Sequence, residues 1–426
     1  MKTSQIHKTN AEKVLTKQKQ CGNIILKISK QFTQQEVIKM KFTVNCTDLK
    51  KAADKVMSVI PKKATMYFME CMEITAENNS IVLHTTNAEQ FAEVKVDATV
   101  IEPGVTYIHK DNMKKVYGLS ELVTIEVADG QFNVKGSKKK SAVPVKDYNK
   151  DDVIAFPTME NAEVFMNIDS QRLVQTLGSL SCFLGDNDNN KLMTEYSFDG
   201  VSKRIVALDG YRIGLRRMPD DFTLDKNVVV PGVTYAQLKK IATEKNDTVE
   251  VLVNDNYIEF SGKDFKLYSR LYEGEYYRVD QIIDTSFDYE MVLNPKELYK
   301  LGKEYNGVVK NLKEPMYFTY DKELDVVRTG VAVPDYITVD ELETVDKKKS
   351  TGLEKDFMYG FNPLYIYEAM QLYDDEVKCH GVIKTSQSGG MITPIVFDND
   401  EYLSLILPVN VKNGIADRFV EYLKAA

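Results

Sequence analysis

The residues that could carry out chemistry form no recognisable catalytic arrangement in this sequence. The four histidines lie far apart, and none has a nucleophile or a further metal ligand at a telling spacing. Acidic residues are plentiful, but no pair of carboxylates is set apart as a general acid and base. The five cysteines form no CxxC motif, which favours reduced, mostly buried thiols over disulfides or a zinc site. The sequence therefore predicts neither an enzyme nor a bound cofactor.

Two short segments imitate ligand-binding loops, and each lacks what such a loop requires. Asp186–Asn190 resembles the first half of a calcium-binding EF-hand loop, but Lys191 stands where the turn needs glycine. Ser197 occupies the place of the bidentate glutamate. Gly136–Lys140 has the residue types of a phosphate loop without the GxxxxGK spacing. We expect a polar loop in the first case and a solvated hairpin end in the second.

The remaining chemistry is electrostatic and belongs to lysines on predicted helices. A single lysine-bearing helix is usually just a solvated face, but here basic residues recur on helix after helix. The net charge of −8 argues weakly against nucleic acid, yet charge can be segregated by face. Lysines gathered on one surface suit a polyanion that is held without reading of its bases. The candidate DNA-binding residues are Lys50, Lys51, Lys55, Lys63, Lys114, Lys115, Arg172, Lys239, Lys240, Lys296 and Lys300.

A repeat defines the elements that position these lysines. Three segments align without a gap at intervals of about 125 residues: FTVNCTDL (42–49), MNIDSQRL (166–173) and MVLNPKEL (291–298). In each copy a short apolar alternation ends at Asn45, Asp169 or Asn294. Such side chains can accept a hydrogen bond from the first turn of a helix. Each copy therefore predicts a strand, a helix cap and a helix.

A second helical segment recurs at a similar interval and completes the plan. Its copies are Met113–Val116, Leu238–Ile241 and Ile366–Ala369, the last preceded by Asn362 and Pro363. Predicted strands flank every helix. The interval is too long for a solenoid, whose repeats span about 20–50 residues. It indicates three similar domains of α+β class, each with two helices on a curved antiparallel sheet.

Length and composition agree with three globular domains. The 426 residues are 43% hydrophobic and 28% charged, which allows sizeable cores. No apolar run approaches the ~18 residues of a membrane span, and no signal peptide is evident, so we expect a cytoplasmic address. The predicted parts are a disordered extension (1–40), domains at 41–160, 161–286 and 287–426, a surface loop at 340–355 and a C-terminal tail at 412–426.

Four segments in order, together with the repeats, resemble the bacterial sliding clamp family, the β subunit of DNA polymerase III. They are MKFTVNCTDL (40–49), ALDGYRIGLRRM (207–218), VVVPGVTYAQLKKI (228–241) and TPIVFDNDEYLSLILPVNV (393–411). Any one of them alone is a weak signal, and their joint occurrence is specific. The resemblance covers about residues 40–411.

The resemblance implies a ring of two chains joined head to tail, with twelve helices lining a hole around duplex DNA. It implies a non-catalytic processivity factor without a cofactor. Its implied partners are double-stranded DNA, the replicative polymerase subunit, the clamp loader, other proteins with a clamp-binding motif, and a second copy of the chain. No membrane is involved.

The resemblance also implies a pocket that binds a short peptide of each partner between the second and third domains. The matching residues are Met193, Gly210, Tyr211, Arg212, Ile213, Thr393, Pro394, Leu405, Ile406, Leu407, Pro408 and Val409. They would form apolar walls with one cation and a few polar groups. Leu208, where the family commonly has threonine, and the ending Asn410–Val411 depart from the pattern.

The tail past Val411 predicts one more helix. Asn413 can cap it, and Ile415, Phe419 and Leu423 form one apolar stripe. We expect the tail to lie beside or partly over the pocket at the wall Leu405–Val409 and to compete with partner peptides; the alternative is a frayed terminus. Two other functions stay open at this point, namely a metal-dependent nucleic-acid enzyme and a repeat scaffold that binds only proteins.

Overall fold

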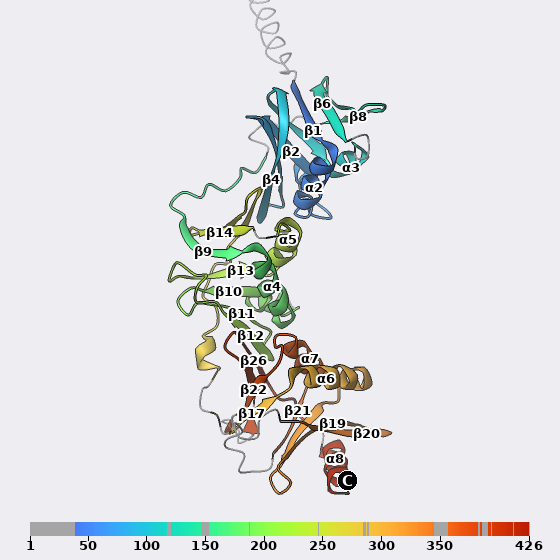
Figure 1. Cartoon of the computed structure of the whole chain (residues 1–426), viewed down its shortest axis with the longest axis vertical. Coiled ribbons are helices and arrows are strands. Elements are labelled where there is room, and N and C mark those ends of the chain that lie inside the picture. Colours follow the sequence, from blue (N-terminus) through green and yellow to red (C-terminus); the bar gives the residue numbers. More distant parts are fainter. Residues whose placement is uncertain are drawn as a thin grey trace, which may run out of the picture. The chain divides into compact units, whose positions relative to one another are not determined.

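The computed structural model describes residues 39–425, with gaps at 117–120, 146–152, 187, 246, 284–286, 288, 345–356, 382–383, 386–390, 393 and 412 (Figure 1). The predicted extension therefore lies almost wholly outside the described residues. The chain forms two compact units. Unit 1 consists of the residues up to Asn87 together with Glu93–Ile154, and unit 2 of Ala88–Ala92 together with Ala155–Ala426. The division into three domains stays a prediction.

The predicted strand, cap and helix are confirmed in all three copies. They are β1 (Met40–Asn45) with α2 (Cys46–Val56), β9 (Glu163–Asp169) with α4 (Ser170–Leu180), and β17 (Tyr289–Leu293) with α6 (Pro295–Val309). The side chain of Asn45 accepts from the backbone N–H of Thr47 at 2.8 Å. Asp169 accepts from Arg172 at 2.9 Å and Asn294 from Lys296 at 2.9 Å. Each cap satisfies a free donor of its helix, so these starts follow from local sequence alone.

Unit 1 is built on antiparallel strands. They are β2 (Cys71–Glu77), β3 (Ser80–Thr86), β4 (Gln90–Glu102), β5 (Gly104–His109), β6 (Leu122–Ala128), β7 (Gln131–Lys135) and β8 (Lys140–Pro144). Strands β8, β7, β6, β1 and β4 follow one another in that order, and β2 lies between β3 and β5. The predicted β6–β7 hairpin turns at Asp129 and Gly130, both with positive φ.

The second helix of unit 1 is shorter than the pattern predicted. Helix α3 (Lys110–Met113) passes into a 3₁₀ turn over Lys114–Val116. Met113 and Val116 are buried and Lys114 and Lys115 are exposed, as expected. Tyr117, the next residue, lies outside the described residues.

A charged cluster covers the outer face of the β5–β2–β3–β4 strands. The His84 imidazole lies between two carboxylates, with Nδ1 3.1 Å from Glu73 and Nε2 3.4 Å from Glu93. The Tyr107 hydroxyl donates to Glu73 at 2.5 Å. Burial alone would lower the pKa of His84, but the two carboxylates outweigh burial and raise that pKa to about 9. The cluster therefore holds a charged imidazole at neutral pH.

We expect this cluster to make the stability of unit 1 depend on pH. The folded pKa of His84 exceeds its unfolded value of about 6.5, so the contribution is complete below about pH 6.5 and is lost as pH rises through about 9. The free energy of unfolding should fall by about 2–3 kcal/mol over this range. Denaturant titrations at pH 6.5, 7.5 and 9 measure the fall. His84→Gln should remove most of it, and equal pH dependence in both proteins would refute the assignment.

Unit 2 is centred on an eight-stranded antiparallel sheet in the order β13-β10-β11-β12-β26-β25-β22-β17. Besides β17, these are β10 (Glu195–Asp199), β11 (Arg204–Leu208), β12 (Arg212–Arg217), β13 (Asn227–Pro231), β22 (Val377–Gly381), β25 (Ile395–Asp398) and β26 (Tyr402–Ile406). Strand β9 pairs in a sheet with β14 (Thr248–Val253), which is followed in the sheet by β15 (Tyr257–Ser261) and β16 (Phe265–Arg270). A separate short pair consists of β23 (Lys384–Thr385) and β24 (Met391–Ile392). Helices α4, α5 (Val233–Ile241), α6 and α7 (Pro363–Met370) lie along one side of the sheets of unit 2 (Figure 1). The predicted α+β class is confirmed.

A four-stranded sheet, which we call the C-terminal sheet, completes unit 2. Its order is β20 (Tyr336–Leu342), β19 (Val326–Val333), β18 (Met316–Asp321) and β21 (Phe357–Phe361). The predicted surface loop at 340–355 is wrong in its first part, because Asp340 to Leu342 complete β20. The charged residues suggested a loop, but β20 is an edge strand, and edge strands commonly carry charged side chains. Residues 345–356 lie outside the described part.

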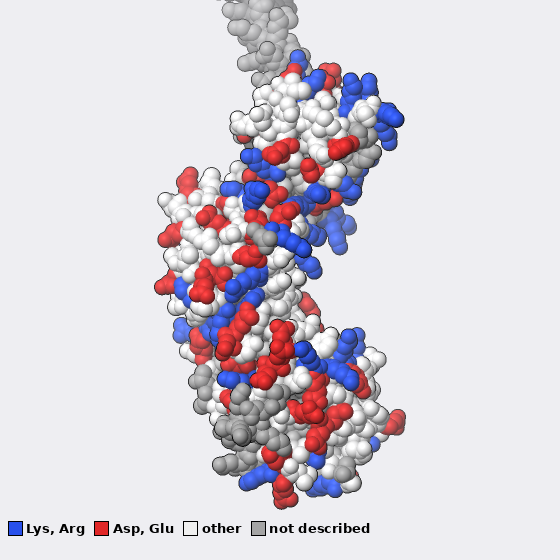
Figure 2. Space-filling model, viewed as in Figure 1, with Lys and Arg blue, Asp and Glu red and all other residues white. Residues whose placement is uncertain are grey.

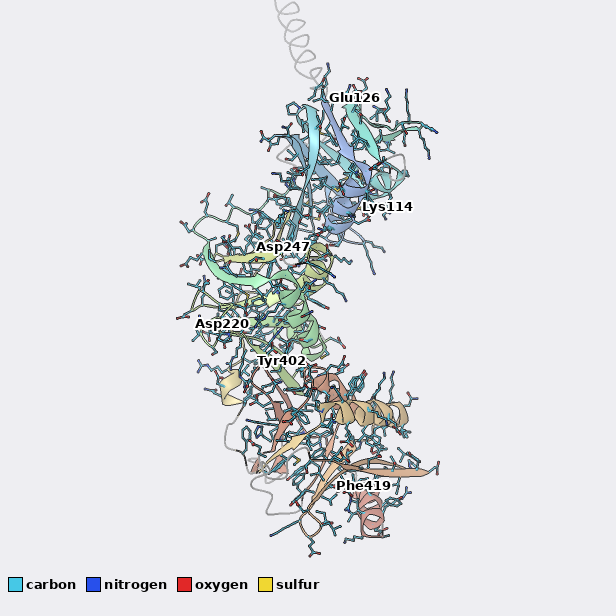
Figure 3. All side chains as sticks on the ribbon, viewed as in Figure 1. Lys114, Glu126, Asp220, Asp247, Tyr402 and Phe419 are labelled. Atoms are coloured by element: carbon cyan, nitrogen blue, oxygen red, sulfur yellow. The ribbon has the colours of Figure 1, made fainter. Side chains whose placement is uncertain are left out.

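The predicted tail helix is confirmed as α8 (Asn413–Ala425), but the surface on which we expected it to pack is wrong. The helix packs on the C-terminal sheet, with Phe419 at the contact (Figure 3). The Phe419 ring stacks on Tyr317 with centroids 4.4 Å apart. It does not lie on the pocket wall. An amphipathic helix packs on an apolar face that is open to it, and residues around Val279 already pack on part of the face of β12 and β26, whereas the C-terminal sheet offers α8 an apolar face of its own.

Candidate functional site

The two sides of β12 and β26 carry different side chains. Ile213 and Leu215 of β12, with Leu403 and Leu405 of β26, point to the side opposite the helices and form one apolar cluster. Arg212 and Arg216 alternate with them and point towards the helices. Because β12 pairs with β26, this cluster crosses the boundary between the second and third repeats. The pairing thus builds one continuous surface from residues almost two hundred positions apart.

A linking segment closes one side of this surface, and sequence reasoning missed it. Val279 is buried in the cluster, within a 3₁₀ turn over Val279–Gln281. The Tyr276 hydroxyl donates to the Glu195 carbonyl at 3.2 Å. Tyr277 and Asn190 exchange hydrogen bonds at about 3 Å. The dense aromatic and branched residues of 276–287 in an otherwise polar stretch were the available signal.

A cavity of about 380 Å³ opens on this surface. Leu215, Leu403, Ile283 and Phe287 supply its apolar lining. Two ion pairs stand at its polar part, Arg204 with Asp280 at 2.8 Å and Arg217 with Asp398 at 2.9 Å, and Gln281 completes the lining. A cavity of this size with an apolar floor and a few charged groups suits a short peptide or a small molecule.

Four members of the predicted peptide pocket belong to the same surface. Met193, Ile213, Leu405 and Leu407 pack in or against the apolar cluster. Tyr211, just before β12, is 63% exposed, and its ring stacks on Tyr365 of α7 with centroids 6.4 Å apart. Gly210 is next to it with φ +87°, and a Cβ there would approach Met193 Cε to 3.3 Å. The structure therefore brings these predicted residues together.

Other predicted pocket residues lie elsewhere. Ile406 points to the helix side and is fully buried. Pro408 and Val409 leave the surface, and the Val409 N–H donates to the Gly360 carbonyl of β21 at 2.8 Å. Pro394 is half-buried just before β25, and Thr393 lies outside the described residues.

The cation expected in the pocket is not available to a ligand. Arg212 is only 6% exposed, and its guanidinium donates to Asp209 at 3.0 Å and to Glu368 of α7 at 2.5 Å. It also donates to the Cys182 carbonyl and lies 4.2 Å from the ring centroid of Tyr365. Burial alone would lower the pKa of Arg212, but Glu368 and Asp209 raise it. Arg212 therefore joins the second repeat to the third.

The free cysteine in this region is chemically inert. Burial raises the pKa of the Cys182 thiol to about 11, with an opposing contribution from Arg212. A thiol with this pKa stays protonated at neutral pH and is a poor nucleophile. Among the described residues, no group of three or more His, Cys, Asp or Glu side chains could hold a metal ion.

The predicted basic residues are unevenly distributed over the helices. Lys50 and Lys51 of α2, Lys239 and Lys240 of α5, and Lys296 and Lys300 of α6 are exposed, as are Lys63, Lys114 and Lys115, while Lys55 is half-buried. Arg172, the one basic residue of α4, is held by Asp221 at 3.3 Å. Helix α7 carries no lysine or arginine. The exposed cations thus lie on α2, α5, α6 and the 3₁₀ turn Lys114–Val116, except for Lys63, which lies in the connection after α2.

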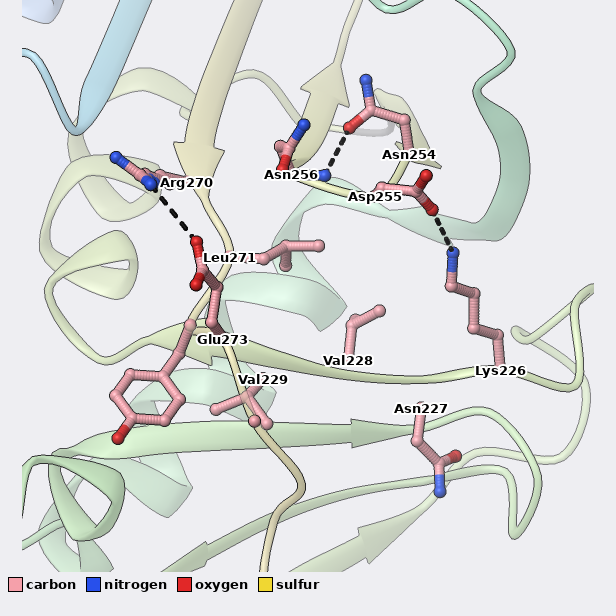
Figure 4. Close-up of a pocket in the computed structure, with 12 residues that line it drawn as sticks. Lys226, Asn227, Val228, Val229, Asn254, Asp255, Asn256, Arg270, Leu271 and Glu273 are labelled. Carbon is pink, nitrogen blue, oxygen red and sulfur yellow. Dashed lines mark hydrogen bonds and ion pairs between the residues drawn. The ribbon is translucent and has the colours of Figure 1, made fainter.

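A second hollow lies beside β13 and is a weaker candidate (Figure 4). Its volume is about 190 Å³, and its lining is mainly polar. Arg270 pairs with Glu273 at 3.3 Å, and Lys226 lies 3.9 Å from Asp255. The Asn254 side chain accepts from the Asn256 N–H at 2.9 Å. These groups largely satisfy one another, which leaves little to recognise a ligand.

No described helix is long and apolar enough to cross a membrane.

Known proteins resemble this chain in both sequence and fold. Residues 167–277 match the family model described as DNA polymerase III beta subunit, central domain. Curated proteins named beta sliding clamp are 19% identical in Bacillus subtilis and 22% identical in Streptococcus pneumoniae. The first match covers 87% of this chain and 99% of the relative, and the second 86% and 98%.

Solved structures agree over the same length. A structure from Eubacterium rectale, named for a DNA polymerase III beta subunit, superposes with a TM-score of 0.76 at 26% identity, covering 87% of this chain and 100% of that one. A sliding clamp from Bacillus subtilis gives a TM-score of 0.76 at 17% identity, with 88% and 100% covered. The predicted resemblance and fold are both confirmed.

Proposed function

We propose that this chain, which resembles the bacterial sliding clamps over most of its length, is a non-catalytic processivity factor. Two copies would close into a ring around duplex DNA and tether the replicative polymerase. The observation that carries this proposal is the β12–β26 junction. Two repeats join there edge to edge in one sheet, with α4 packed on β11 and β12 and α7 on β26. If each repeat is related to the next by the same junction and the same rotation, and the rotation closes, the repeats form a ring.

The junction has a matching pair of unused edges. Strand β12 is the third strand after the first helix of the second repeat, and β20 is the third strand after the first helix of the third repeat. Strand β26 is the last strand of the third repeat, and β8 is the last strand of the first. Within the described residues β20 pairs only with β19, and β8 only with β7. An unpaired edge is a template for another chain. Pairing of β20 with β8 of a second copy would close a head-to-tail dimer.

Charge favours the same pairing. Strand β20 and its flanks carry Asp335, Asp340, Glu341 and Glu343, whereas β8 and the turn before it carry Lys138, Lys139 and Lys140. In Figure 2 basic side chains gather around the end of β8. At the end of α6, Val308 and the nearby Leu312 are 37% and 46% exposed and would add apolar contact. Opposite charge at matching edges selects partner and orientation.

The exposed lysines of α2, α5 and α6 would hold DNA through its phosphates. We expect Lys239→Gln with Lys240→Gln to weaken binding to short duplexes equally for all sequences and to reduce the salt slope by about 0.9 per lost contact. Fluorescence anisotropy between 50 and 200 mM salt measures both values. Lys378→Gln on β22, away from the helices, is the control. An effect that depends on base sequence would contradict phosphate binding.

Partner proteins, including the polymerase subunit and the clamp loader, would dock a short peptide on the apolar surface of β12 and β26. Tyr211, which immediately precedes β12, is 63% exposed, so Tyr211→Ala should weaken binding of a labelled clamp-binding peptide about 5- to 10-fold. Val201→Ala, at an exposed turn of the same unit, is the matched control. Equal peptide affinity in both variants would show that the peptide docks at another place.

A further inference from the structure

Helix α8 has a dedicated seat on the C-terminal sheet. Ala416 and Phe419 are buried there, and Ile415 and Leu423 pack beside them. Gly330 of β19 makes room for both β20 and Phe419, because a Cβ at this glycine would lie 2.2 Å from the Thr338 carbonyl oxygen and 2.9 Å from Phe419 Cε2. A helix of this length is marginal in isolation, so its stability depends on this seat. The fit indicates that the sheet and the helix form one structural unit.

A polar contact ties the helix to the turn that begins β20. Arg418 Nη1 donates to the Pro334 carbonyl at 2.9 Å and to the Val333 carbonyl at 3.4 Å. Val333 is the last residue of β19, and Pro334 begins the connection to β20. The guanidinium therefore holds the point at which the chain reverses into the edge strand.

Strand β20 is held from both of its faces. Ile337 and Val339 pack against the cluster that contains Phe419. On the opposite face, the Tyr305 hydroxyl of α6 donates to the Asp340 carboxylate. Only the free edge of the strand, beyond its pairing with β19, stays open within the described residues. The edge is therefore presented in a fixed conformation.

We infer that α8 is a brace that fixes β20 for pairing with a second copy of this chain, so that residues 412–426 strengthen and prolong ring closure. The inference rests on the proposed pairing of β20 with β8. Ordering of a loose strand during association costs free energy, and a strand already ordered by α8 avoids most of that cost. Without α8 the sheet would also expose Tyr317, Ala332, Ile337 and Val339 to water.

The test compares the full chain with a chain that ends at Val411. We expect the truncated protein to fold, its dimer dissociation constant to rise about tenfold or more, and subunit exchange to quicken. Sedimentation equilibrium and exchange between labelled and unlabelled dimers measure the two effects. Amide hydrogen exchange of β20 should also quicken in the monomer. Tyr422→Ala, at a position 45% exposed on α8, should change none of these values.

Two results would overturn the inference. One is a folded, truncated chain with unchanged dimer affinity. The other is a weakened dimer in which exchange of β20 is unchanged, because α8 would then act by direct contact with the partner. If truncation prevents folding, Arg418→Gln at an exposed position decides: about a threefold weaker dimer supports the brace, and unchanged affinity refutes it. A full chain that is monomeric would instead refute the proposed ring.

Discussion

Replacement of Arg212 by methionine is expected to lower the free energy of unfolding of unit 2 by about 3 kcal/mol or more. Methionine keeps much of the volume but leaves the carboxylates of Asp209 and Glu368 without their shared cation. It also leaves the Cys182 carbonyl without its donor and removes the guanidinium stacked on Tyr365. A buried network that loses one partner loses more than the net value of the pair. Denaturant titration of both proteins, with a check for equal m-values, measures the loss.

Arg217→Met is the matched control. Arg217 lies on the same strand and pairs with Asp398 at 2.9 Å, but its side chain is far more exposed. We expect a loss below about 1 kcal/mol, as for most exposed pairs. Equal losses in the two variants would mean that Arg212 does not join the repeats and that its burial has no special consequence.

Charge reversal at the proposed ring contact is expected to have the largest effect on assembly. Replacement of Lys138, Lys139 and Lys140 by glutamate would place like charges opposite the acidic β20. Like charges at a contact cost several kcal/mol, so the dimer should weaken by about 100-fold or more. Sedimentation velocity across a dilution series measures the monomer fraction, and it should be highest at low salt.

A second variant distinguishes specific repulsion from general damage. Replacement of Glu341 and Glu343 by lysine should weaken the dimer on its own. An equimolar mixture of the two variants should restore association at both contacts of a mixed ring, because one contact keeps its original charges and the other pairs the two reversed edges. Absence of any gain in the mixture, with both proteins folded, would exclude pairing between β20 and β8.

The sequence predicted those parts of the fold that local chemistry determines. Asn45, Asp169 and Asn294 cap their helices because each cap needs only the next three residues. The apolar stripe of the tail likewise predicted α8. The repeat predicted three strand–cap–helix units without any tertiary information. These signals are complete within about ten residues or recur along the chain.

The parts that failed depend on contacts between distant residues. The role of Arg212 depends on which side of β12 it points to and on Glu368, far along the chain. The packing site of α8 depended on which apolar faces the fold leaves open, and residues around Val279 already pack on part of the face of β12 and β26. The resemblance correctly grouped Ile213 with Leu405, yet it could not separate outward residues from inward ones such as Ile406. Alternation within a strand is visible in sequence, but its absolute direction is not.

Retention on DNA tests the central claim most directly. The labelled protein is loaded by its clamp loader onto a nicked circular duplex and isolated at a salt concentration that removes proteins bound only through phosphates. A ring held by topology should stay on the circle and leave within the time needed to slide off once a single cut makes the DNA linear. Equal retention before and after the cut would contradict encirclement, and so would loss from the circle at the same salt that releases the protein from short duplexes.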